Sequence, residues 1–150
     1  MRHALIAWFK SLLSRLWPGA GNRGGAALDP ELCDVFFAEL ADVTSSLRTA
    51  AAAWRASPRD PEALKAVRRG FHTLKGSAPL VGATAIGEFC ATVEQLLIRL
   101  GESPAKITPG AIELIDRAVA LLPAFAAASR DGRPVPPEAR AIATSATRIA

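Results

Sequence analysis

Between residues 61 and 82 the apolar side chains recur at alternating steps of three and four residues, which is the spacing of one helix face. These apolar residues are Leu64, Val67, Phe71, Leu74, Ala78 and Val81. Asp60 and Pro61 precede them as a typical helix start, with a capping carboxylate and a proline in the first turn. Because Pro79 has no N–H to donate, we expect the last turn before Gly82 to loosen. The pattern predicts an amphipathic helix that buries this stripe and exposes its other side.

Three further segments show the same periodicity, and alanine and leucine dominate over the β-branched residues that favour strands. The predicted helices cover residues 29–54, 61–82, 84–100 and 108–125. The first starts at Asp29 and Pro30 and includes Val35 in its apolar stripe. The third is expected to stop at Gly101, and the fourth to bend at Pro123. Amphipathic helices joined by short loops predict an all-α fold, an antiparallel up-down four-helix bundle.

The sequence outside these helices has a different character. The predicted division is an amphipathic helix at 1–17, a Gly-rich linker at 18–27, the bundle at 28–130 and a Pro-containing tail with a weak C-terminal helix at 131–150. The N-terminal helix is too short, and too interrupted by Lys10 and Arg15, to span a bilayer. Trp8 and Trp17 lie on its apolar half, which suits a membrane interface or an apolar groove. Attachment to a membrane surface and packing onto the bundle remain equally open.

Composition excludes several classes of function. The net charge is +4, but the basic residues are scattered and not interleaved with aromatic residues, so no nucleic-acid partner is expected. Cys33 and Cys90 fall on apolar helix faces, which indicates reduced core thiols of a cytoplasmic protein and neither a disulfide nor a zinc site. The sequence shows no phosphate-binding loop, metal-ligand spacing or catalytic triad. We therefore predict no resident metal or cofactor and no ATP-binding kinase domain.

His72 lies outside the apolar stripe, on the solvent side of its helix. The predicted exposed surface around it consists of Lys65, Arg68, Arg69, Lys75, Gly76 and Pro79. A lone histidine on a helix is usually an ordinary surface residue. Here, however, Lys75 is placed to neutralise an anion on the imidazole, and Gly76 leaves room for another molecule to approach. This combination favours a phosphorylatable histidine.

The motif His72-Thr73-Leu74-Lys75-Gly76-Ser77, followed by Gly82, resembles the phosphoacceptor motif of histidine phosphotransfer (HPt) domains. Residues 28–130 look like an HPt bundle, and residues 72–97 resemble the HPt domains of chemotaxis-type histidine kinases. In that group a glutamate on the following helix hydrogen-bonds the phosphoacceptor imidazole, and Glu94 occupies its position. Some members carry a second histidine on that following helix, and Ala91 occupies its position in this chain.

The resemblance implies a module of a two-component phosphorelay that transfers phosphoryl groups but is not a kinase. His72 would accept a phosphoryl group from a histidine kinase or a hybrid-kinase receiver and pass it to a response-regulator aspartate. Glu94 would fix the imidazole tautomer, and Lys75 would offset the phosphoryl charge. Any magnesium would belong to the partner receiver or kinase. The exposed surface around His72 would dock the partner.

Two alternatives of another class remain. In the first, the chain is a helical scaffold that binds signalling partners without phosphotransfer. In the second, it is an adaptor whose residues 1–17 act at a membrane surface. The expected location is the cytoplasm, with attachment to the inner face of the membrane if the N-terminal helix binds lipid.

Overall fold

The computed structural model describes residues 30–150. The expectations for residues 1–17 and 18–27, and for capping by Asp29, lie outside this part of the chain. The helices are α2 (Pro30–Ala56), α3 (Pro61–Ser77), α4 (Thr84–Glu102), α5 (Pro109–Arg130) and α6 (Pro137–Ile149), with 3-10 turns η1 (Ala78–Val81) and η2 (Pro104–Lys106). No strand occurs among residues 30–150, so the predicted all-α class is confirmed.

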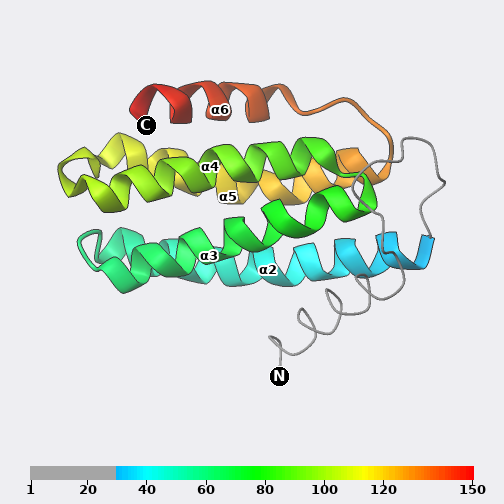
Figure 1. Cartoon of the computed structure of the whole chain (residues 1–150), viewed down its shortest axis with the longest axis horizontal. Helices are drawn as coiled ribbons and strands as arrows, with labels where there is room; N and C mark the ends of the chain where they lie inside the picture. Colours follow the sequence, from blue (N-terminus) through cyan, green and yellow to red (C-terminus); the bar gives the residue numbers. More distant parts are fainter. Residues whose placement is uncertain (1–29) are drawn as a thin grey trace.

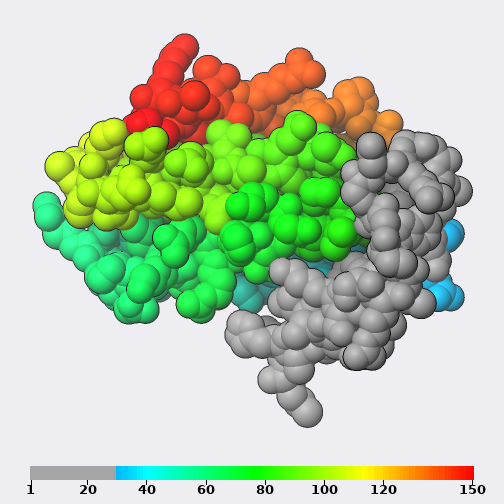
Figure 2. All heavy atoms as spheres, in the orientation of Figure 1, coloured from blue at the N-terminus to red at the C-terminus, as the bar shows by residue number. Residues whose placement is uncertain are grey.

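Helices α2 to α5 form the bundle, with the chain running up and down between successive helices (Figure 1). Helix α3 packs against α2 and α4, and α2 also packs against α5. In the space-filling view α3 and α4 occupy the face toward the viewer, and α6 lies along one edge (Figure 2). One apolar cluster runs through the whole bundle.

The apolar stripe predicted on α3 is buried along its full length, from Leu64 to Val81. The stripe of α2 differs from its prediction at one place, because Val35 is 45% exposed. Phe36 beside it, which the predicted stripe also includes, is buried, and further along the helix the polar Thr44 is buried as well. Thr44 can occupy the core because its hydroxyl donates to the Leu40 carbonyl within the same helix.

The end of α3 follows the behaviour expected of Pro79. The α-helix stops at Ser77, and the chain continues as the 3-10 turn η1, since Pro79 cannot donate to the carbonyl one turn earlier. Gly82 then ends the turn with a φ of 73°, a left-handed conformation that glycine adopts without a Cβ clash. This reversal brings α4 back alongside α3.

The prediction that α4 stops at Gly101 is wrong. The helix continues through Glu102, and Ser103 caps it. Pro104 explains the true end, because the residue before a proline avoids the helical region of backbone space.

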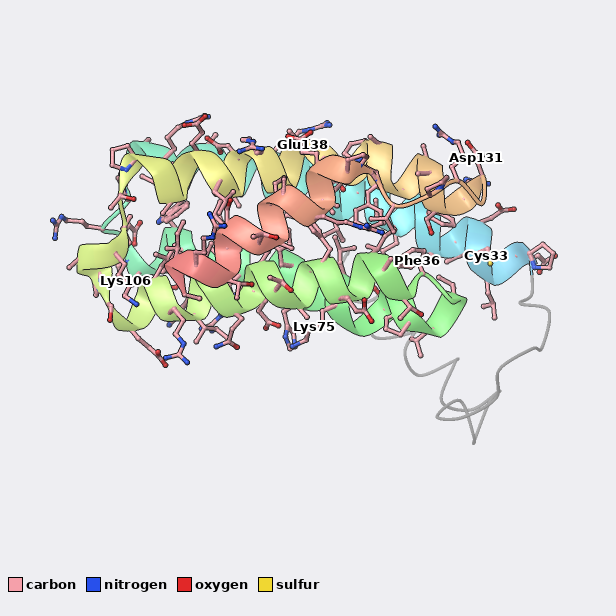
Figure 3. All side chains as sticks on the ribbon, turned by 90° about the horizontal axis from the view of Figure 1, so that it is seen from above. Cys33, Phe36, Lys75, Lys106, Asp131 and Glu138 are labelled. Atoms are coloured by element: carbon pink, nitrogen blue, oxygen red, sulfur yellow. The ribbon has the colours of Figure 1, made fainter. Side chains whose placement is uncertain are left out.

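Helix α5 begins as predicted, with Thr108 accepting from the Ala111 N–H, and it continues as a helix through Pro123. The predicted C-terminal helix is present as α6 and contributes Ala139, Ile142 and Ala146 to the core. It packs against α4 and α5 and crosses them obliquely (Figure 3). None of the helices within residues 30–150 is long and apolar enough to cross a membrane.

Candidate functional site

The site lies on the seam between α3 and α4, defined here as the line along which these two helices pack. His72 stands on α3 with its side chain 60% exposed. Its Nδ1 atom lies 2.6 Å from Oε1 of Glu94 on α4, a short hydrogen-bond distance. Glu94 itself is buried, with 7% of the residue exposed. The structure therefore places an exposed imidazole against a buried carboxylate. Glu94 is not a solvated carboxylate at the edge of its helix.

Lys75 binds the other oxygen of the same carboxylate. Its ammonium forms an ion pair with Oε2 of Glu94, while His72 holds Oε1. Since Lys75 follows His72 by about one helical turn, both side chains leave α3 on the same side. Figure 3 shows Lys75 at the edge of the bundle that faces away from α5. The three residues that the sequence singled out for chemistry thus meet in one cluster.

The electrostatics of this cluster fix which imidazole nitrogen carries the proton. Burial alone would raise the pKa of the Glu94 carboxyl, but hydrogen bonds from Lys75 and His72 outweigh burial and lower this pKa below its usual value. Glu94 is therefore ionised at neutral pH and can only accept hydrogen bonds. Nδ1 of His72 must then donate its N–H, which leaves the lone pair of a neutral ring on Nε2. Among the described residues, Nε2 has no hydrogen-bond partner, so it is open to an incoming reactant.

A second potential nucleophile lies close by but is held inactive. Cys90 precedes Glu94 by one turn of α4 and is fully buried. Burial, together with the Glu94 charge, raises the pKa of the Cys90 thiol to about 12. The thiol stays protonated and enclosed, so His72 carries the accessible nucleophilic atom of the cluster.

The predicted docking residues form one exposed surface along α3 and η1. They are Lys65, Arg68, Arg69, Gly76 and Pro79. Lys65 pairs with Glu62 at 3.4 Å, whereas Arg68 and Arg69 have no ion pair with any described residue. Among these docking residues, the positive charge lies on the N-terminal side of His72, and the small or apolar residues lie on its C-terminal side.

One residue of the seam was not singled out by the sequence analysis. Gly87 is buried on α4, and a Cβ atom built there would lie 3.2 Å from both Cγ and Cδ of Pro79. The only sequence signal for it is a glycine inside a predicted helix, two turns before Glu94.

No cluster of three metal-ligating side chains occurs among residues 30–150, and the cluster on the seam consists of an exposed imidazole and an ammonium bound to one buried carboxylate. A family model for the Hpt domain matches residues 31–125, and the chain belongs to this family. Hpt domains are phosphotransfer modules of phosphorelay signalling that interact with kinases and response regulators. No solved structure matches the chain.

Proposed function

We propose that His72 is the phosphoacceptor of this Hpt domain and that its Nε2 atom is the nucleophile. The observation that carries the proposal is the 2.6 Å hydrogen bond between Nδ1 and Glu94. This bond supports a ring with its proton on Nδ1, and its lone pair on the exposed Nε2.

In the proposed transfer, the Nε2 lone pair forms a bond to phosphorus while the bond from phosphorus to the donor atom breaks. The electron pair of the broken bond stays on the donor, which is a receiver aspartate or a kinase phosphohistidine. No proton has to leave Nε2, because the proton is already on Nδ1. The positive charge that develops on the ring is stabilised by the Glu94 carboxylate, and Lys75 offsets the negative charge of the phosphoryl oxygens. The reverse steps pass the group to an aspartate of a response regulator.

The partner surface follows from the charges around His72. Receiver aspartates sit in acidic, magnesium-binding pockets, which are complementary to the basic side chains of Lys65, Arg68 and Arg69. Gly76 and Pro79 offer a surface without long side chains on the other side of the imidazole. The metal in this proposal belongs to the partner, and the complex forms in the cytoplasm.

Residues 1–17 would be a detachable anchor of the module. A membrane surface suits their apolar half, with Lys10 and Arg15 near anionic lipid headgroups. The alternative is packing of Trp8 and Trp17 onto the bundle. Liposome flotation of the full chain beside a truncation that begins at Ala27 distinguishes these two attachments.

Incubation of the chain with a phosphorylated receiver protein tests the function. The wild type should gain an acid-labile phosphate, and His72→Gln should gain none while keeping its fold. The fold is expected to persist because His72 is exposed and its removal leaves no cavity. Equal labelling of His72→Gln would overturn the assignment. An unlabelled wild type that still binds the receiver would favour the scaffold alternative.

A further inference from the structure

The α3–α4 seam contains a second close contact, which lies in register with the His72–Glu94 hydrogen bond. Pro79 follows His72 by seven residues, and Gly87 precedes Glu94 by seven. Because the two helices run antiparallel, both pairs face one another across the same seam. Seven residues of helix correspond to about 10 Å, so the contact lies two turns from the imidazole.

The second contact leaves little room for a side chain on α4. A Cβ atom at Gly87 would lie 3.2 Å from Cγ and from Cδ of Pro79, and 3.7 Å from Cβ of Ala78. The first two distances are shorter than an ordinary carbon–carbon contact. A long flexible side chain could turn away, but the ring of Pro79 is bonded to its own backbone nitrogen and fixes φ. A methyl group at this position would therefore push the helix against η1 and widen the seam.

We propose that Gly87 is a positioning residue that, through Pro79, sets the separation of α3 and α4 and thereby the hydrogen bond between His72 and Glu94. The bond at 2.6 Å is shorter than an ordinary N–H···O hydrogen bond, so even a small widening of the seam lengthens it and weakens its hold on the ring. A widened seam frees the ring to exchange its proton between Nδ1 and Nε2. The consequence for transfer rests on the proposed function, whereas the consequence for the tautomer does not.

The chain offers a matched control on the same helix. Gly101 follows Glu94 by seven residues, just as Gly87 precedes it by seven. A Cβ atom at Gly101 would lie 3.4 Å from Cδ2 of Leu64, the end of a side chain that can rotate. Alanine raises helix propensity at both positions, although less at Gly101 in the last turn than at Gly87 in the interior, so a disruption seen only in Gly87→Ala reports the contact across the seam.

Nitrogen-15 NMR of the His72 ring at a pH where it is neutral measures the tautomer directly. The wild type and Gly101→Ala should show the Nδ1–H tautomer with a strongly hydrogen-bonded proton. Gly87→Ala should show a mixture of tautomers and about tenfold slower transfer from a phosphorylated receiver. Pro79→Ala in the Gly87→Ala background should restore the Nδ1–H signal, because it removes the opposing ring.

The outcomes that overturn the inference are distinct from those that overturn the function. A wild-type ring signal in Gly87→Ala would show that Gly87 does not position His72. If Gly87→Ala does not fold, the double variant must fold, and failure of both would contradict a role through Pro79. A wild-type chain that accepts no phosphate while its ring signals follow the prediction would reject only the phosphotransfer function.

Discussion

The seam between α3 and α4 and the seam between α2 and α5 differ in where their charged side chains lie, buried in the first and near the exposed ends in the second. On the first, a buried carboxylate binds two cationic or polar side chains from the facing helix. On the second, ion pairs lie near the ends, with Asp34 and Arg130 at 2.5 Å and Arg55 and Asp116 at 2.7 Å. Between them lies a hollow of about 430 Å³, lined mostly by small or apolar side chains and also by Arg48 and Arg130.

Under the proposed function, this difference separates a buried charge that serves chemistry from exposed ion pairs that contribute little. Exposed ion pairs gain little because water screens both partners, and the side chains of Asp34 and Arg130 are both more than half exposed. A buried carboxylate costs much more to desolvate and persists only where donors compensate it. A charge buried beside an exposed imidazole is therefore informative about function, whereas the surface pairs are not.

The largest expected effect comes from removing the buried carboxylate. Glu94→Ala should slow phosphotransfer by about 10- to 100-fold without abolishing it, the range expected for one hydrogen bond to a charged group. Stopped-flow measurement of transfer from a phosphorylated receiver gives the rate. Asp116→Ala removes a carboxylate from the other seam and should leave the rate unchanged. Equal slowing in both variants would mean that the two seams do not differ in function.

A smaller effect should appear in the dependence of stability on pH. The pKa of Glu94 is lower in the folded chain than its ordinary value of 4.5, because hydrogen bonds from Lys75 and His72 outweigh burial. The ionised form therefore stabilises the fold above that ordinary value, and the contribution disappears as pH falls through the lowered pKa. The stability advantage of wild type over Glu94→Gln should shrink as pH falls below about 4.5 and through the lowered pKa of Glu94. Urea unfolding at each pH measures it, and an advantage that grows in acid would contradict the assignment.

The smallest effect should come from the surface pair between α2 and α5. Arg55 is more than half exposed, so Arg55→Ala should change the free energy of unfolding by less than about 1 kcal/mol. Thermal or urea denaturation measures the change. A loss of several kcal/mol in the free energy of unfolding would show that this pair stabilises the fold despite its exposure.

The sequence predicted most of the fold because helix faces depend on local spacing, whereas the position of Glu94 in the cluster came from the resemblance to HPt domains. The stripe from Leu64 to Val81 placed His72 on the outside of α3, and the family alignment placed Glu94 opposite it. Val35 was assigned wrongly because helical spacing defines a face only to within one position, and the neighbouring helices decide which residue they cover. Gly101 was read as a stop, although Ser103 before Pro104 gave the stronger signal.

Tertiary contacts limited the rest. No local pattern in the sequence shows that α6 packs across α4 and α5, since its short apolar stripe suits several surfaces. Gly87 was overlooked for the same reason, because the need for glycine there arises from Pro79 on another element. Single-sequence patterns identify which residues face inward, but not how closely two elements approach.

The covering of α4 and α5 by α6 limits where partner proteins can bind. With that side closed, and with a single imidazole on the opposite seam, a phosphoryl donor and a phosphoryl acceptor would have to occupy the same patch. Under the proposed function they visit in turn, so the chain works as a shuttle and not as a bridge. Relay flux would then rise with the concentration of either partner only until that partner begins to exclude the other.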